Sequence, residues 1–192
     1  IMYSCSTFDT TSAKEIIELN PEYIKVPSAC NNNVEMLKVL RDNYSGNVHI
    51  SFGMTTKQQQ HEIFNFFNEH DQAFRLVLYA CTSGYPVPFD DVCLLEISRL
   101  RELYSDKVSA IGFSGHHHGI AVDIAAYTLG AEWFERHFTL DRTWKGTDQV
   151  FSLEPTGMRK LARDLRATKK SLTYKKNDIL DIEKPKGGYE KY

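Results

Sequence analysis

The stretch Leu76-Val77-Leu78-Tyr79 is a short apolar run of the kind that forms a buried β-strand. Polar residues follow it at Thr82 and Ser83, and helical periodicity then extends over 90–104. A second apolar run, Val108-Ser109-Ala110-Ile111, comes next. A strand, a helix and another strand at this spacing predict two parallel strands joined by a crossover helix.

The same unit recurs on both sides of this stretch. Six apolar runs are spaced by roughly 22 to 32 residues, the length of a βα repeat. They lie at 1–4, 23–26, 48–51, 76–79, 108–111 and 132–135. Helical patterns follow them at 12–19, 34–43, 56–68, 90–104, 120–129 and 155–172, and start signals include Thr55 or Thr56, Asp90-Asp91 and Pro155. Strict alternation predicts an α/β fold in which helices cover a parallel sheet.

The polar residues favour a (β/α)8 TIM barrel over a doubly wound nucleotide-binding sheet. A doubly wound sheet usually has a glycine-rich turn after its first strand, whereas the first turn here is Cys5-Ser6-Thr7-Phe8-Asp9. In a barrel, functional side chains collect at the carboxyl ends of the strands. Such side chains follow all six runs, at Ser6, Lys25, Ser28, Ser51, Thr82, Ser83, Tyr85, Ser114, His116 and His137. Six units are two fewer than in a typical barrel of roughly 250 residues, so we expect a partial barrel.

The composition excludes several classes of protein. The 192 residues are 42% hydrophobic and 25% charged, with a formal net charge of −2, which is typical of a globular protein and not of a disordered chain or coiled coil. No apolar run approaches the ~18 residues of a membrane span, and the charge balance argues against a nucleic-acid partner. Four cysteines without CxxC spacing indicate a reducing compartment, so we expect a cytoplasmic protein.

His116 and His137 are candidate metal ligands. They lie at the ends of consecutive predicted strands, and neighbouring parallel strands are about 4.8 Å apart, so the two imidazoles can share one divalent cation. Such a cation, for which we expect Mn²⁺ or Mg²⁺, would act as a Lewis acid on a carbonyl group. The alternative is that His116 belongs to a solvated histidine-rich turn and His137 to the core.

Lys25 lies inside an apolar run, where an unpaired ammonium group is costly. Together with hydroxyl groups at neighbouring strand ends it resembles a phosphate pocket, and a Schiff-base lysine is the alternative. The hydroxyls are those of Ser6, Ser28, Ser51 and Ser114. Tyr85 and Asp148 are candidates for hydrogen bonds to a polyol. Glu132, Glu135 and Arg136 are predicted to form structural pairs or pairs at the rim.

Several of these motifs together resemble the sialic acid synthase family, which comprises N-acetylneuraminate synthases and related nonulosonic acid synthases. The motifs cover about residues 2–170 in order. They are Cys5-Ser6-Thr7-Phe8-Asp9, Tyr23-Ile24-Lys25-Val26-Pro27-Ser28, Ser51-Phe52-Gly53-Met54, Cys81-Thr82-Ser83-Gly84-Tyr85-Pro86, Gly112-Phe113-Ser114-Gly115-His116, Glu135-Arg136-His137-Phe138-Thr139-Leu140-Asp141-Arg142, Gly146-Thr147-Asp148 and Ser152-Leu153-Glu154-Pro155.

The resemblance implies an enzyme that condenses phosphoenolpyruvate with an N-acylated aminosugar of the N-acetylmannosamine type. It makes His116 and His137 the metal ligands. The catalytic residues that it implies are His116, His137 and Lys25. It places phosphoenolpyruvate at Ser6, Lys25, Ser28, Ser51 and Ser114, and the acceptor sugar at Ser83, Tyr85 and Asp148. It also makes the Schiff-base alternative for Lys25 less favourable.

The sequence departs from the family pattern at two positions near this site. The family commonly has an acidic residue where this chain has Cys30, and its frequent Ser-Asp-His-Thr turn is Ser114-Gly115-His116-His117 here. The same alignment places Ile1 in the third barrel strand, so the chain would contain the last six βα units of the barrel. The first two βα units, which carry a glutamate and a lysine of the family's site, would lie outside this chain. So would the family's C-terminal antifreeze-like domain, which donates an arginine to the partner's site within a homodimer.

We therefore expect residues 1–172 to form a partial TIM-barrel synthase domain and residues 173–192 to form a linker toward the antifreeze-like domain. The expected activity is a phosphoenolpyruvate-dependent carbon–carbon bond-forming transfer that yields a nonulosonic acid and phosphate. The alternatives are a pseudaminic or legionaminic acid synthase, and an inactive truncated barrel that acts as a scaffold. A metal-dependent hydrolase is a weaker alternative, because no HxH pair ends the first strand.

Overall fold

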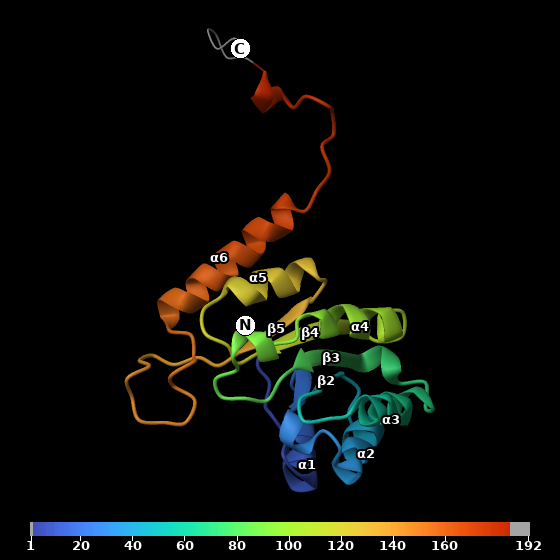
Figure 1. The fold of residues 1–192 in the computed structure, drawn as a ribbon. Helices are drawn as coiled ribbons and strands as arrows, with labels where there is room; N and C mark the ends of the chain where they lie inside the picture. Colours follow the sequence, from blue (N-terminus) through green and yellow to red (C-terminus); the bar gives the residue numbers. More distant parts are fainter. Residues whose placement is uncertain (1, 185–192) are drawn as a thin grey trace.

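The computed structural model describes residues 2–184 and contains one parallel sheet with helices along its outer side (Figure 1). The strands are β1 (Tyr23–Val26), β2 (Asn47–Ser51), β3 (Leu76–Cys81), β4 (Ala110–Gly115) and β5 (Trp133–Arg136). Each strand pairs in parallel with its neighbour in the sequence, in the order β1-β2-β3-β4-β5. The predicted βα alternation is therefore confirmed over these five strands.

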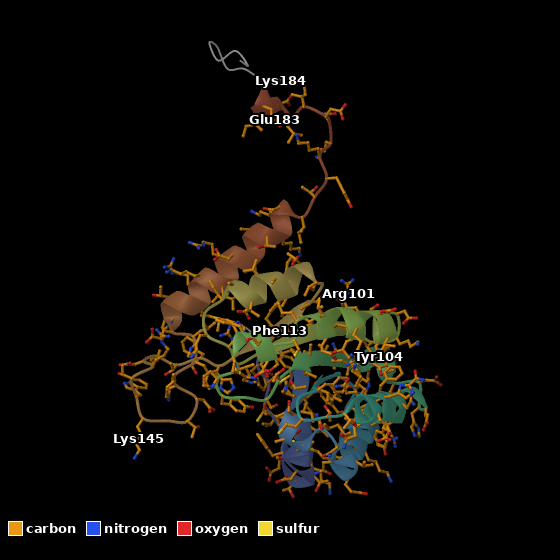
Figure 2. The ribbon with its side chains drawn as sticks, viewed as in Figure 1. Arg101, Tyr104, Phe113, Lys145, Glu183 and Lys184 are labelled. Carbon is orange, nitrogen blue, oxygen red and sulfur yellow. The ribbon has the colours of Figure 1, made fainter. Side chains whose placement is uncertain are left out.

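The helices are α1 (Thr10–Glu18), α2 (Val34–Asn43), α3 (Lys57–Asn68), α4 (Leu95–Tyr104), α5 (Ala121–Thr128) and α6 (Pro155–Ser171). Helix α1 precedes β1, helices α2 to α5 connect successive strands, and α6 follows β5. Short 3₁₀ turns lie at Ser28–Cys30, Ala73–Arg75, Phe89–Asp91 and Asp181–Glu183. Beyond α6 the chain extends away from the sheet, and Figure 2 shows Glu183 and Lys184 far from the strands. Within residues 2–184, no helix has the length and apolar composition needed to cross a membrane.

Two predictions about individual elements were wrong. The predicted strand at 1–4 is absent over its described residues, and the chain meets β1 two residues later, through an isolated parallel bridge between Ser6 and Lys25. Met2 and Tyr3 are more than half exposed, so no packing favours strand pairing there. The predicted helix at 90–104 begins at Leu95, because Cys93 has a left-handed φ of 52°, which ends the preceding 3₁₀ turn.

The two faces of the sheet carry different side chains. Residues such as Ile24, Ile50 and Leu78 point outward and pack with the helices in the main apolar core. Aromatic residues fill the inner face, where the Tyr23 and His49 rings stack at 4.1 Å and Trp133 meets His49 edge-on at 4.7 Å. This alternation follows from the two-residue period of a strand. One side of the sheet is therefore available for a site.

The sheet is strongly curled. In a flat sheet, β1 and β5 would lie about 19 Å apart, because strands are spaced by ~4.8 Å. Instead, Lys25 Nζ on β1 lies 3.3 Å from Glu135 Oε2 on β5, and the Tyr23 and Trp133 ring centroids are 5.6 Å apart. The side chains of the first and last strands thus meet inside the curl, as in a half-barrel.

Candidate active site

A cleft of about 470 Å³ opens at the carboxyl ends of the strands. It is lined by nine of the ten residues predicted for the site, which are Ser6, Lys25, Ser28, Ser51, Tyr85, Ser114, His116, His137 and Asp148. These residues come from the ends of the five strands and the loops that follow them, except Ser6, which precedes α1 and bridges to Lys25 on β1. Parallel strands bring their carboxyl ends to one edge of the sheet, which explains why residues so far apart in the sequence share one cleft.

Lys25 is the centre of a hydrogen-bonded network that spans the cleft floor. Its ammonium group is almost fully buried and donates to Ser51 Oγ at 2.8 Å and to the Val26 carbonyl oxygen at 3.2 Å. It also lies 3.3 Å from the Glu135 carboxylate, which accepts a hydrogen bond from Ser114 Oγ at 2.8 Å. The network offers a cation and two hydroxyl groups at one place, and these groups can bind an anion.

Glu135 is more central than the sequence analysis placed it. The sequence predicts a structural or rim pair for Glu135, whereas its carboxylate lines the cleft and is the counter-charge of the buried Lys25. Two signals in the sequence could have found it. Glu135 is two residues before His137 and therefore on the same side of β5, and a lysine predicted inside a strand requires an acidic partner.

His116 and His137 lie side by side at the cleft, with ring centroids 5.3 Å apart. His116 Nδ1 lies 3.0 Å from the Thr82 carbonyl oxygen. Since a carbonyl oxygen can only accept, Nδ1 carries the proton and Nε2 keeps its lone pair. Burial lowers the pKa of His116, and burial together with His116 lowers the pKa of His137, so both rings are neutral at neutral pH.

These two rings fit a shared divalent cation, although they do not complete its coordination. Both rings are neutral, and the bond from His116 Nδ1 to the Thr82 carbonyl oxygen leaves the lone pair of His116 Nε2 available to a metal ion. The ring separation allows one ion to reach both histidines at metal–nitrogen distances of ~2.1 Å. In the described part of the chain, no group of three or more His, Cys, Asp and Glu side chains is arranged to hold a metal ion. Water or substrate oxygens would have to fill the other positions.

Tyr85 and Asp148 lie next to the histidine pair. The Tyr85 ring is 4.6 Å from the His116 ring and 6.1 Å from the His137 ring. Asp148 Oδ2 is 3.6 Å from His137 Nδ1, which is an ion pair only when His137 is protonated. Asp148 belongs to the loop between β5 and α6, whose ends are held together because Leu153 N donates to the His137 carbonyl oxygen at 2.8 Å. Figure 2 shows Lys145 at the tip of this loop, directed away from the sheet.

Ser83 is the predicted residue that does not line the cleft. Its hydroxyl group is buried against Gly53, beside Ser28, whose Oγ accepts a hydrogen bond from Gly53 N at 3.1 Å. A Cβ atom at Gly53 would collide with Ser83 Oγ and would lie 2.6 Å from Ser28 Oγ. The absence of a side chain at Gly53 therefore allows both hydroxyl groups to approach the end of β2.

The two departures from the family pattern also have structural explanations. The Cys30 thiol is buried and donates to the Thr7 carbonyl oxygen at 3.3 Å, so it contacts the backbone behind the cleft. A Cβ atom at Gly115 would lie 2.8 Å from the Phe113 ring and 2.9 Å from the His117 ring. An aspartate has no room at position 115, because the two aromatic rings occupy that space.

Comparison with known proteins identifies the family of this chain. A family model described as the NeuB family matches residues 1–177. This chain belongs to the NeuB family. Among curated NeuB-type proteins, it is 35% identical over 183 residues to N-acetylneuraminate-9-phosphate synthase from Homo sapiens, covering 95% of this chain and 50% of that protein. It is 31% identical to N,N'-diacetyllegionaminic acid synthase from Campylobacter jejuni, covering 90% of this chain and 51% of that protein.

Solved structures show the same fold. The chain matches the N-acetylneuraminic acid synthetase of Leptospira borgpetersenii, determined in complex with citrate, with a TM-score of 0.85 and 28% identity. The match covers 95% of this chain and 62% of that one. A truncated 3-deoxy-D-arabino-heptulosonate 7-phosphate synthase from Thermotoga maritima matches with a TM-score of 0.74 at 14% identity, which shows the fold alone. This chain spans about half the length of the curated relatives named above.

Proposed function

We propose that the protein condenses phosphoenolpyruvate with an N-acylated aminosugar of the N-acetylmannosamine type and releases a nonulosonic acid and phosphate. The observation that carries the proposal is the cleft itself, in which the buried Lys25 network lies beside a pair of neutral histidines. An anion pocket next to a possible Lewis-acid site suits a reaction between an anionic enol ester and an aldehyde. Membership of the NeuB family supports the same reaction class.

The anionic substrate would occupy the Lys25 side of the cleft. Lys25 supplies a positive charge, and Ser51, which accepts a hydrogen bond from Lys25, keeps its hydroxyl proton to donate to a phosphate or carboxylate oxygen. Ser114 would donate to the anion by turning its hydroxyl proton away from Glu135. Ser6 and Ser28 line the same part of the cleft and extend this set of donors. Glu135 holds Lys25 in place, and a bound anion would share the ammonium group with it.

The acceptor sugar would lie at the histidine side of the cleft, against Tyr85 and Asp148. In the proposed reaction, C3 of phosphoenolpyruvate bonds to the aldehyde carbon of the open-chain sugar, water adds at C2, and phosphate leaves. Asp148 can accept hydrogen bonds from sugar hydroxyl groups, and the Tyr85 ring covers the histidine pair. A divalent cation, Mn²⁺ or Mg²⁺, bound by His116 and His137 would polarise the aldehyde.

The relatives suggest which acceptors to test. The human relative is named for a product phosphorylated at carbon nine. Because phosphoenolpyruvate contributes three carbons, that phosphate comes from carbon six of the acceptor. The panel should therefore include N-acetylmannosamine with and without a 6-phosphate, and the acceptors for legionaminic and pseudaminic acids, since synthases of both acids are also relatives. We propose a homodimer, and we place it in the cytoplasm because its four cysteines are free.

Phosphate release by the full-length protein tests the proposal. With phosphoenolpyruvate, an acceptor from the panel and Mn²⁺, the wild-type protein should release phosphate. His116→Ala and His137→Ala should each abolish this release, because each removes one of the two imidazoles. His61→Ala is the matched control, since His61 is exposed on α3 away from the cleft. Wild-type turnover in a correctly folded His116→Ala or His137→Ala protein would refute the roles of these residues.

A further inference from the structure

A cluster of three buried polar side chains lies directly behind the histidine pair. His117 and Asp123 are fully buried and Arg136 is nearly so, and we call these three residues the buried cluster. His117 Nε2 lies 3.2 Å from Asp123 Oδ2, and Arg136 forms an ion pair with the same carboxylate. The His117 and Arg136 side chains alternate with the residues that face the cleft and are buried on the outer side of the sheet, although Arg136 is also among the residues that border the cleft.

Each strand residue of the cluster is next to a cleft histidine in the sequence. His117 follows His116 at the end of β4, and Arg136 precedes His137 at the end of β5. Arg136 Nη2 donates to the His117 carbonyl oxygen at 2.7 Å, and Nη1 donates to the Gly119 carbonyl oxygen at 2.9 Å. The guanidinium group therefore bonds to the backbone of the turn that carries His116. Asp123, in the first turn of α5, fixes that guanidinium group from the helix side.

The composition of the cluster favours a positional role over a purely stabilising one. Burying an arginine and an aspartate is costly even when they pair, and apolar residues of similar size often give equal or greater stability. Within residues 2–184, His117 Nδ1, Asp123 Oδ1 and Arg136 Nε are buried without hydrogen-bond partners, which adds to that cost. These residues instead fix the orientation of the backbone and side chains around them, because the planar guanidinium group bonds to several acceptors at fixed angles.

We propose that His117, Asp123 and Arg136 are positioning residues that set the separation of His116 and His137. The cluster joins the ends of β4 and β5 at the last ladder pair, Gly115 and Arg136, and extends this link to His117 and the turn after it. This inference rests on the proposed function, because a fixed separation of the His116 and His137 rings matters when both rings bind the same ligand. The arrangement itself concerns the protein without any ligand, so it can be tested separately.

The decisive experiment observes the imidazole rings directly. Full-length protein labelled with ¹³C and ¹⁵N in its histidines is compared with Asp123→Asn, a substitution that keeps the side-chain shape and removes the charge. We expect the NMR signals of the His116 and His137 rings to shift or broaden. The His61 and His70 signals, from α3 and the turn after it, should not change. Asp164→Asn is the control, because Asp164 pairs with Arg163 on the exposed face of α6.

Metal affinity provides a second measurement. The dissociation constant for Mn²⁺, followed by the electron paramagnetic resonance signal of the free ion, should rise by about tenfold or more in Asp123→Asn. Phosphoenolpyruvate binding in metal-free buffer should change little, because Asp123 does not line the cleft. If Asp123→Asn does not fold, the double substitution Asp123→Asn with Arg136→Gln removes both buried charges. It is judged by the ring signals and the Mn²⁺ affinity, because Arg136 borders the cleft and its loss can change phosphoenolpyruvate binding directly.

The outcomes separate the two proposals. If the His117 signal moves in Asp123→Asn while the His116 and His137 signals and the Mn²⁺ affinity stay at wild-type values, the positioning role is refuted. If the wild-type protein neither binds Mn²⁺ nor releases phosphate, the proposed function fails. The ring signals of the metal-free protein would still decide whether the buried cluster positions the two histidines.

Discussion

Lys25 is a buried ammonium group whose partners come from β2 and β5 as well as from its own strand. Lys25→Met keeps an apolar chain of similar length and removes the charge from the anion pocket. We expect the affinity for phosphoenolpyruvate, measured by calorimetry, to fall by about 10- to 100-fold, the worth of a hydrogen bond to a charged group. Lys107→Met, at an exposed position after α4, is the matched control. Unchanged affinity in Lys25→Met would place the anion elsewhere.

His49 gives the stability of the protein a defined pH dependence. Burial, with a smaller contribution from Lys25, lowers its pKa from 6.5 to about 3. Between these values the unfolded chain binds a proton that the folded protein does not. The stability due to the neutral ring is therefore fully present above about pH 6.5, and it is lost as the pH falls toward about 3, at up to ~1.4 kcal/mol per pH unit.

His49→Phe should remove this dependence, because phenylalanine keeps the stacked ring and cannot be protonated. The measurement is the free energy of unfolding in urea at several pH values between about 7 and 5. The wild-type protein should lose stability faster than His49→Phe over this range, whereas His61→Phe, changed at an exposed histidine, should retain the wild-type slope. Equal slopes for the wild-type protein and His49→Phe would contradict the prediction.

Residues at strand ends could be assigned to one cleft from the sequence, because the carboxyl ends of parallel strands meet at the same edge of the sheet. This reasoning brought Lys25, Ser51 and Ser114 together correctly as neighbours. The partnership of Lys25 with Glu135 was not predictable in the same way. It depends on how far the sheet curls, and the curl is set by packing across the whole inner face.

Among the helices, α3 shows how a local signal determines where an element begins. The sequence left Thr55 and Thr56 as alternative caps, and the structure shows that Thr56 Oγ1 accepts from Gln59 N while the Gln59 side chain accepts from Thr56 N. Thr56→Ala should lower the free energy of unfolding by about 1 kcal/mol, measured in urea. Gln58→Ala, at the second residue of the same helix, should have a much smaller effect on the free energy of unfolding. A loss as large in Gln58→Ala would mean that the cap is not responsible.

The predicted helices were accurate where their ends are set by nearby residues, and wrong where they are set by tertiary structure. Helix α2 begins and ends where the sequence predicts, because Asn33 caps it through its side chain. The start of α4 was misplaced because Asp90-Asp91 resembles a cap, whereas the backbone turns at Cys93 first. The segment at 1–4 has a strand-like composition, but its described residues form no strand. Met2 and Tyr3 are exposed there, so their burial does not stabilise strand pairing.

At the scale of the molecule, the curl of the sheet leaves its inner face accessible. A cavity of about 490 Å³ lies between the first residues and α6, and its lining includes Tyr23, Tyr79 and Trp133. β1 and β5 are the edges of the described sheet. Tyr79 is buried, but Tyr23 and Trp133 are partly exposed, and exposed aromatic surface and strand edges both promote association between molecules.

We therefore expect a polypeptide of residues 1–192 alone to self-associate and to bind the dye ANS. Light scattering coupled to gel filtration should give a mass that increases with concentration, and ANS fluorescence should exceed that of the full-length protein. A concentration-independent monomer with the ANS fluorescence of the full-length protein would show that this chain protects its inner face by itself. The same sample, assayed for phosphate release, would distinguish an active piece from an inactive scaffold.

The contact between Lys25 and Glu135 also has a consequence for the order of folding. Every strand pairing joins consecutive strands, whereas this contact joins the first strand to the last. Contacts between residues distant in the sequence have the largest loop-closure entropy, so they form late. Neighbouring βα units can assemble first from any point in the chain. The cleft comes into existence when the two ends of the sheet meet, so a chain that has only its local strand pairings still lacks the cleft.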